Sequence, residues 1–237
     1  NMTVRCYEQD PYGRLRPADV FNWFQEAACC QCRLHKAAIE DLRPKGYTWI
    51  IHRYKIVVAR MPVYGEDCRV STWAHPRRDL LSVRDFALES ASGERLVSAT
   101  SQWALIDLKA QRPARLSAAL AYFPACGERA LDEELKPLSV PAGLAPLGET
   151  EQKATAWCLD QNDHVNNSVY VSWAYDGLYP HIKGTPALRE MEVNYKRQAF
   201  HGQAVTCRTS AAPGGVYYSE LSLGGEPLAL VRSAWSA

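Results

Sequence analysis

One structural unit occurs twice in this sequence, and this repeat limits the fold more than any other feature. Asp160 and Trp173 flank a polar loop and an apolar helical pattern, and they recur 150 positions earlier as Asp10 and Trp23. The spacing within the pair is the same in both copies. We therefore predict a duplicated fold within a single chain.

A second match changes the offset between the copies. Gly65 lies between two strand-like segments, and Gly202 does so in the second copy, an offset of about 137 residues. The connection between the helix and the strands is therefore predicted to be shorter in the second copy.

Hydrophobic periodicity predicts the same order of elements in both copies. In the first, residues 3–9 alternate like a strand, residues 17–39 have apolar side chains at helical spacing, and four strand-like segments follow. In the second, we predict a strand at 153–159, a helix at 167–179 and four strands between residues 188 and 234. The predicted fold class is α+β, with two long helices that are each wrapped by a curved antiparallel β-sheet.

Composition and charge exclude several classes of protein. With 237 residues, of which 47% are apolar, the chain can bury a large core without disulfides or metals. Its formal net charge of +1 argues against nucleic-acid binding, which normally needs a basic excess. No apolar run is long enough to span a membrane, and residues 1–5 lack the core of a signal peptide. We therefore expect a cytoplasmic location.

The eight cysteines are expected to be free thiols. Three of them crowd together at residues 29–32, where bridging has poor geometry, and the other five are scattered singly. Because the chain lacks two CxxC pairs, we predict no zinc site.

The polar loop of the second copy has the residue types that hydrolysis needs. Asp160, Asn162 and His164 alternate just before a predicted helix start, where outward-pointing amides and the helix dipole suit a carbonyl oxygen that gains negative charge. We predict that Asp160 is the general base or water-positioning group, that Asn162 fixes substrate or water, and that His164 donates to the leaving group or orients the water. The alternative is that these residues only form a turn and cap a helix.

From Asp160 to Trp173 the sequence resembles the acyl-acyl-carrier-protein thioesterases, in which Asp-x-Asn-x-His-Val-Asn-Asn-x-x-Tyr-x-x-Trp precedes the helix of the second of two fused hotdog domains. The resemblance implies a tandem double hotdog fold. It also implies hydrolysis of fatty acyl-acyl carrier protein, which releases free fatty acid and terminates chain elongation, without metal or organic cofactor. Asp160, Asn162 and His164 would take the family's catalytic positions.

The chain departs from the plant members of that family at one site position. Those members have Tyr-Arg-Arg-Glu-Cys on a later strand, where this chain reads Tyr-Lys-Arg-Gln-Ala at residues 195–199. Gln198 therefore replaces an acidic residue. It could hold a water by hydrogen bonds, but it cannot act as a base.

The domain boundaries follow from a segment rich in proline and glycine. Residues 124–150 contain four prolines and three glycines, which is typical of a connection between folded units. We predict an N-terminal hotdog domain on the substrate-pocket side at residues 1–123, a crossover linker at 124–150, and a C-terminal hotdog domain with the catalytic loop at 151–237.

A fatty acyl substrate needs an apolar tunnel and a place for its carrier to dock. Candidates for the tunnel wall are Phe21, Phe24, Trp49 and Ile51. An acidic carrier protein would dock on basic side chains, for which the candidates are Arg77, Arg78, Lys109, Arg112, Arg115, Lys196 and Arg197. The alternatives are an acyl-CoA thioesterase, a hotdog dehydratase or a non-catalytic acyl-binding module. The sequence leaves chain length and branching open, and it is compatible with a homodimer.

Overall fold

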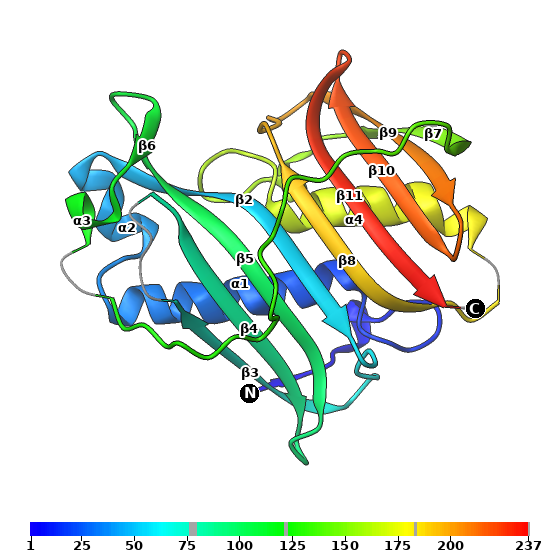
Figure 1. Ribbon diagram of the computed structural model, residues 1–237, viewed down its shortest axis with the longest axis horizontal. Helices are drawn as coiled ribbons and strands as arrows, with labels where there is room; N and C mark the ends of the chain where they lie inside the picture. The colour runs from blue at the N-terminus through cyan, green and yellow to red at the C-terminus, as the bar shows by residue number, and fades with distance from the viewer. Residues whose placement is uncertain (76–79, 121–122, 183, 237) are drawn as a thin grey trace.

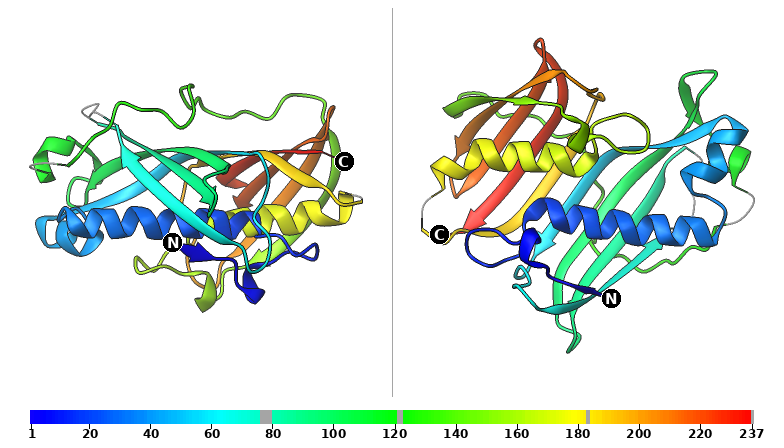
Figure 2. Two further views of the ribbon diagram at one scale, coloured as in Figure 1. Left: turned by 90° about the horizontal axis from the view of Figure 1, so that it is seen from below. Right: turned by 180° about the vertical axis from the view of Figure 1, so that it is seen from behind.

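The computed structural model describes residues 1–75, 80–120, 123–182 and 184–236. Two helices, α1 (Pro17–Leu34) and α4 (Asn167–Leu178), lie on one face of a large antiparallel sheet (Figure 1, Figure 2). Pro17 fits the first turn of α1, where its missing N–H is not needed. The Asn166 side chain caps α4 by accepting a hydrogen bond from the Ser168 N–H at 3.0 Å.

Eleven strands form the sheet within the described residues. The first half of the chain supplies β1 (Met2–Thr3), β2 (Tyr47–Val58), β3 (Asp67–Ala74), β4 (Ser82–Ser90), β5 (Arg95–Asp107) and β6 (Arg112–Ala114). The second half supplies β7 (Ala145–Lys153), β8 (Ala187–Tyr195), β9 (Ala204–Ala212), β10 (Val216–Leu223) and β11 (Glu226–Ser236). The short helical turns are η1 (Cys6–Glu8), α2 (Ile39–Leu42), η2 (Arg43–Lys45), α3 (Leu116–Ala119), η3 (Ala156–Cys158) and η4 (Tyr179–His181).

The strand order is the same in both halves when it is read outward from the middle of the sheet. The first half runs β2, β5, β4, β3, β1, and the second runs β8, β11, β10, β9, β7. The halves join where β2 pairs with β8, with Arg53 opposite Asn194 and Lys55 opposite Glu192. Both halves therefore have the same topology, as the repeat predicts, and a helix against a curved antiparallel sheet is the hotdog arrangement.

The helices and the sheet differ from the prediction of two long helices with a sheet around each. The second helix, α4, has 12 residues against 18 in α1. It ends just before Pro180, which cannot continue the helical hydrogen bonds. The β2–β8 pairing also makes one continuous sheet instead of two.

Two predicted strands are also placed differently. In residues 3–9 the chain leaves β1 after Thr3 and turns at η1, because the Glu8 carboxylate accepts hydrogen bonds from the Arg5 N–H at 2.9 Å and the Trp23 indole at 3.0 Å. In residues 153–159 the chain instead forms the η3 turn. The strand of this region is β7, which begins at Ala145, within the segment predicted as a linker.

Aromatic side chains fill the core between α1 and the sheet. Phe24 stacks on Phe86 with ring centroids 4.9 Å apart, and Phe21 packs against Tyr54 at 4.7 Å. All four are almost fully buried. Truncating one such ring typically costs about 3–5 kcal/mol, so these residues hold α1 at a fixed height above β2 and β4.

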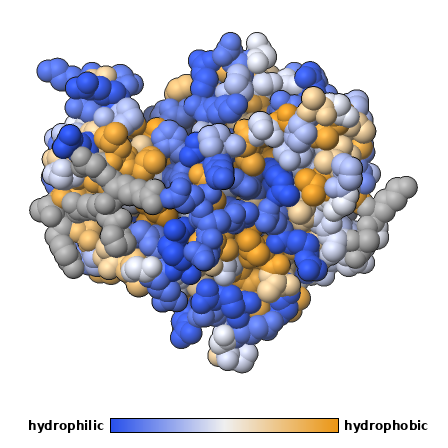
Figure 3. All heavy atoms as spheres, viewed as in Figure 1, coloured by the Kyte–Doolittle hydropathy of each residue, from blue (hydrophilic) through white to orange (hydrophobic). Residues whose placement is uncertain are grey.

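The segment after α3 crosses the face of the sheet opposite to the helices (Figure 1, Figure 2). The Lys55 ammonium pairs with Glu133 at 2.7 Å and with Glu190 at 3.2 Å. The buried Asp85 carboxylate accepts a hydrogen bond from the Ala130 N–H at 2.6 Å. Figure 3 shows that the middle of this face is hydrophilic. Polar contacts therefore bind the segment to the sheet.

Candidate functional site

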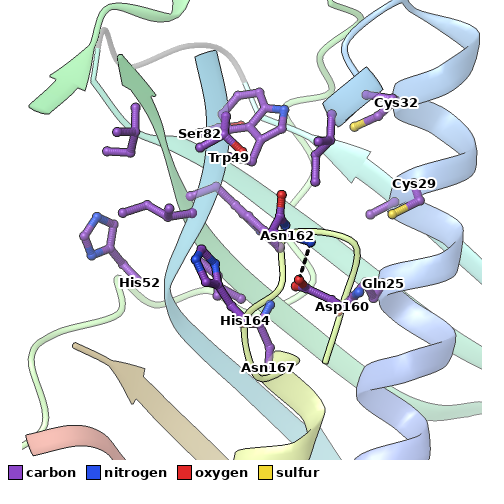
Figure 4. A pocket seen from close by; sticks show the side chains of 18 of the residues that line it. Gln25, Cys29, Cys32, Trp49, His52, Ser82, Asp160, Asn162, His164 and Asn167 are labelled. Atoms are coloured by element: carbon purple, nitrogen blue, oxygen red, sulfur yellow. Dashed lines mark hydrogen bonds between the residues drawn. The ribbon is translucent and has the colours of Figure 1, made fainter. Parts of the chain in front are cut away.

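One large cavity of about 1120 Å³ lies where the two halves meet. Its wall is formed by parts of α1, β2, β4 and β5, by the loop at residues 160–167 and by residues 195–200. Figure 4 shows Asp160, Asn162 and His164 projecting into this space beside α1. The structure therefore brings these three predicted catalytic residues together with Gln198, which lines the same cavity.

Hydrogen bonds within the loop fix the position of Asp160. Its Oδ1 accepts from the Asn162 N–H at 2.7 Å, and its own N–H donates to the His164 carbonyl at 2.8 Å. Asp163 closes the turn with a φ of 58°, a conformation that Asp tolerates better than most residues. Within the described part of the chain, Oδ2 of Asp160 accepts no hydrogen bond, so it is available to a water.

Backbone contacts bring His164 close to the segment that carries Gln198. The Val165 N–H donates to the Ala199 carbonyl at 2.9 Å, and His164 forms a β-bridge with Phe200. The imidazole also meets the Phe200 ring edge-on, with centroids 5.0 Å apart. The segment that carries Gln198 and the polar loop therefore share one site, although Gln198 lies 34 positions after His164.

A residue of the first half orients the Asn162 side chain. Arg43 Nη2 donates to Asn162 Oδ1 at 3.0 Å. Because a guanidinium can only donate, the side-chain oxygen of Asn162 must face Arg43. The amide NH2 group of Asn162 is then the part that remains for a ligand, so Asn162 can act as a hydrogen-bond donor in the cavity. No local pattern indicates Arg43 as a site residue, because this contact spans 119 positions.

The start of α4 is better capped than we predict from the sequence. Asn166 Oδ1 accepts hydrogen bonds from both the N–H and the hydroxyl of Ser168, at 3.0 and 3.1 Å. The Ser168 amide is therefore not free to bind a carbonyl oxygen. The first helical residue, Asn167, does line the cavity, and the positive end of the helix dipole still lies there.

The twin loop of the first half has the same turn but different surroundings. Asp10 Oδ1 accepts from the Tyr12 N–H at 2.8 Å, and Gly13 closes the turn with a φ of 78°. Both oxygens of Asp10 also bind Arg14, through Oδ1 to its N–H at 2.9 Å and through Oδ2 to its guanidinium at 2.8 and 3.0 Å. Arg14 thus occupies the place of His164 and neutralises the carboxylate.

The predicted tunnel residues divide into two groups. Trp49 and Ile51 line the cavity, and the Trp49 indole donates to the Ala37 carbonyl at 3.0 Å. Phe21 and Phe24 do not line it, because they point into the core toward Tyr54 and Phe86. That part of the prediction is not supported by the structure.

Sequence reasoning missed several residues of the cavity wall, among them His52, Cys29 and Cys32 (Figure 4). Burial, and secondarily Arg53, lowers the pKa of His52, so its imidazole is neutral near pH 7. Burial raises the pKa of Cys29 to about 11, so the thiol stays protonated and is a poor nucleophile.

The basic candidates for carrier docking are distributed over the surface. Arg77 and Arg78 lie outside the described residues. Lys196 and Arg197 are exposed and line the cavity, and Arg197 pairs with Glu226 at 3.1 Å. The remaining docking candidates, Lys109, Arg112 and Arg115, are also exposed, but they do not line the cavity.

The described residues offer neither a metal-binding cluster nor a membrane-spanning helix. They contain no group of three His, Cys, Asp or Glu side chains that could hold a metal ion. None of their helices combines the length and the apolar character that crossing a membrane requires.

Comparison with known proteins gives the same family over both halves. The family model for the acyl-ACP thioesterase N-terminal domain matches residues 1–121, and that for the acyl-ACP thioesterase C-terminal domain matches residues 149–236.

Two plant relatives are similar over most of this chain. One is oleoyl-acyl carrier protein thioesterase 1, chloroplastic, of Arabidopsis thaliana, which is 24% identical and covers 87% of this chain and 62% of its own length. The other is oleoyl-acyl carrier protein thioesterase, chloroplastic, of Coriandrum sativum, with 26% identity over 87% of this chain and 60% of its own length. The chain therefore spans somewhat over half the length of these relatives.

Two solved structures have the same fold. A putative oleoyl thioesterase from Lactobacillus plantarum superposes with a TM-score of 0.89 at 21% identity, over 100% of this chain and 94% of its own. The 12:0-ACP thioesterase from Umbellularia californica superposes with a TM-score of 0.87 at 20% identity, over 99% of this chain and 95% of its own. At these identities the likeness concerns the fold.

Proposed function

We propose that this chain, which belongs to the acyl-ACP thioesterase family, hydrolyses the thioester bond of a fatty acyl-acyl carrier protein. The products are a free fatty acid and the carrier thiol, so the reaction ends elongation of the acyl chain. The observation that carries the proposal is the large cavity that reaches Asp160, Asn162 and His164 together. It offers room for both a thioester and the water that attacks it.

In the proposed reaction, Asp160 activates the water. Its Oδ1 is engaged in the turn, and its Oδ2 takes a proton from the water as the water oxygen bonds to the carbonyl carbon. A positioned general base of this kind contributes roughly a hundred- to ten-thousandfold. His164 gives a proton to the sulfur when the carbon–sulfur bond breaks, so the leaving group departs as a thiol.

The negative charge on the carbonyl oxygen is stabilised by donors held in place before the substrate arrives. The Asn162 amide is such a donor, since Arg43 fixes its orientation. The positive end of the α4 dipole at Asn167 adds to it. Removing one donor of this type typically costs about 3–4 kcal/mol of transition-state stabilisation.

Gln198 serves as a water-holding residue in this proposal. Its amide can donate one hydrogen bond and accept another, and it lines the cavity next to the segment that contacts His164. It cannot take up a proton, so the role of base falls to Asp160.

A thiol-release assay on acyl carrier protein thioesters of graded chain length tests the proposal. We expect turnover by the wild-type chain and a loss of at least about a hundredfold in Asp160→Asn. Asp163→Asn is the matched control, because it makes the same chemical change in the same turn at an exposed residue whose positive φ suits Asn. Full turnover by Asp160→Asn would remove this carboxylate from the mechanism, and no release from any chain length would overturn the activity.

The same assay separates the alternative functions. An acyl-CoA thioesterase would hydrolyse the CoA thioester faster than the carrier thioester of the same acyl chain. Thiol release without a change in unsaturation would exclude a dehydratase and a non-catalytic binding module.

We also propose residues 1–123 and 151–237 as the two hotdog domains of a tandem double hotdog and residues 124–150 as the linker between them. The family matches, which leave out residues 122–148, support this division. A cytoplasmic location and a homodimer stay proposals, which cell fractionation and sedimentation over a range of concentrations would test.

A further inference from the structure

A buried arginine lies in the cavity wall at a distance from the proposed catalytic loop. Arg84, on β4, is 6% exposed and lines the cavity. Its Nη1 donates to Gln31 Oε1 and, at 3.1 Å, to Thr72 Oγ1, while Nη2 approaches Cys32 Sγ at 3.8 Å. The guanidinium also lies over the Phe123 ring, 5.4 Å from its centroid. All of these neighbours are neutral groups.

The charge of Arg84 therefore lacks a counter-ion in the described part of the chain. The adjacent carboxylate, Asp85, contacts His75 at 2.9 Å and Arg129 at 3.5 Å, and none of its contacts is with Arg84. Burial lowers the pKa of Arg84 and raises the pKa of the Cys32 thiol, so this thiol does not supply a negative charge. A buried cation without an anionic partner is costly, and it is normally paired or solvated.

The contact between Arg84 and Cys32, a residue of α1, gives the distance of the guanidinium from the proposed reaction centre. Gln25, Cys29 and Cys32 face the cavity one after another along this helix, and Gln25 lies at the level of Asp160 (Figure 4). Cys32, which contacts Arg84, lies seven positions after Gln25 on α1, so the two are about 10 Å apart along the helix axis at the rise of an α-helix. An extended acyl chain of roughly eight carbons spans that length at ordinary carbon–carbon bond lengths.

A plain hydrocarbon chain of this length would bring apolar atoms to Arg84. It would displace the water in the cavity that can solvate the guanidinium and offer no acceptor in return. An oxygen atom at the same place would accept a hydrogen bond from the guanidinium, and a carboxylate would also neutralise its charge.

We propose that Arg84 makes the far end of the cavity a subsite for an acyl chain that carries an oxygen function, a hydroxyl or a carboxylate, at about its eighth carbon. The inference rests on the proposed thioesterase function and names its substrate class. Trp49 and Leu116 also line the cavity and give it apolar wall.

Three carrier-protein thioesters of the same carbon number test the proposal: octanoyl, 8-hydroxyoctanoyl and octanedioyl joined through one carboxyl. We expect the wild-type kcat/KM for at least one oxygenated chain to exceed that for octanoyl about tenfold or more, the gain of one charge-assisted hydrogen bond. A preference for octanedioyl alone identifies an anion subsite, and a preference for both chains identifies a subsite for any oxygen. Equal or faster hydrolysis of octanoyl overturns the proposal, whatever an Arg84 variant does.

Arg84→Met should remove the preference by lowering kcat/KM for the oxygenated chains to that for octanoyl. Arg53→Met is the matched control. Arg53 is half-buried on β2, donates to Gln102 Oε1 at 2.8 Å and does not line the cavity. The control should keep the wild-type preference.

A binding measurement separates this proposal from the proposed function. Octanedioic acid should raise the Tm of the full wild-type chain more than octanoic acid does at equal concentration, and Arg84→Met should abolish the difference. If octanedioic acid gives the larger Tm increase but no thioester is hydrolysed, the Arg84 subsite is supported and the proposed thioesterase function is refuted. If thioesters are hydrolysed but the two acids shift the Tm equally, the thioesterase function is supported and the Arg84 subsite is refuted.

Discussion

The two twin loops allow a structural carboxylate to be distinguished from a catalytic one by the same substitution. We expect Asp10→Asn to destabilise the fold while hydrolysis continues, and Asp160→Asn to stop hydrolysis while the fold is kept. The two loops have the same turn, in which the carboxylate accepts the N–H two residues on at 2.8 Å for Asp10 and 2.7 Å for Asp160. A difference between the variants therefore reports on the surroundings of the turn.

The hydrogen bonds give the size of the expected effects. Asp10 accepts four of them from Tyr12 and Arg14, and the side chains of Asp10 and Arg14 are 5% and 17% exposed. Breaking a buried pair of this kind typically costs about 3–5 kcal/mol. Because Arg14 keeps its bond to the Pro186 carbonyl, we expect about 2–4 kcal/mol for Asp10→Asn. Asn at position 160 can still accept from the Asn162 N–H, so its cost should stay below about 1 kcal/mol.

Thermal and urea unfolding followed by circular dichroism measure these costs. For a chain of this size, 1 kcal/mol shifts the Tm by about 2–4 °C. Asp10→Asn should therefore lower the Tm by roughly 5–15 °C and Asp160→Asn by less than about 4 °C. Thiol release, measured at a temperature where both variants are folded, should fall at least about a hundredfold in Asp160→Asn alone. The reasoning is refuted if folded Asp10→Asn loses turnover equally, or if Asp160→Asn is destabilised as much.

Three further changes test the site and its supports. Arg43→Met should lower kcat roughly three- to tenfold in steady-state kinetics with little change in KM, because the Asn162 amide loses the bond that orients it; a change confined to KM would instead indicate contact with substrate. Gln198→Ala should lower kcat about tenfold through loss of a held water, and an unchanged kcat would remove Gln198 from the site. Gly177→Ala should cost about 1–3 kcal/mol in urea unfolding, since its added Cβ would lie 3.1 Å from Thr209 Oγ1; unchanged stability would show that α4 can shift.

The sequence predicted the topology and the loop because both depend on local patterns that are repeated. Asp163 and Gly13, 150 positions apart, both have positive φ, at 58° and 78°. The repeat therefore includes the backbone conformation of individual residues. The failure at residues 3–9 is also local in origin. There, a capping interaction of Glu8 with the Arg5 N–H outweighs the alternating pattern.

The assignment of residues to cavity or core could not be made from the sequence. Phe21, Phe24, Trp49 and Ile51 are all apolar and all periodic, but the two phenylalanines of α1 pack on the sheet while Trp49 and Ile51 line the cavity. The contact between Arg43 and Asn162 could not be predicted from the sequence for a similar reason. Hydrogen bonds between distant segments depend on how the two halves join. The hydrophobic periodicity of the sequence does not predict how they join.

The shorter connection in the second half explains why the loop at Asp160 borders the large cavity and its twin does not. Between α1 and β2 the first half inserts α2 and η2, and residues of both, including Arg43, line the cavity. Between α4 and β8 the described residues form only η4. There, the Gly184 carbonyl accepts from the Tyr12 hydroxyl at 2.7 Å and the Pro186 carbonyl from the Arg14 guanidinium at 2.7 Å. In the first half, the inserted α2 and η2 form part of the cavity wall beside the Asp160 loop. In the second half, the short connection instead binds the side chains of Tyr12 and Arg14 in the Asp10 loop. Since both loops have the same turn, the length of the connection, together with the residues that replace Asn162 and His164 in the first copy, distinguishes the loop that borders the cavity from the one that does not.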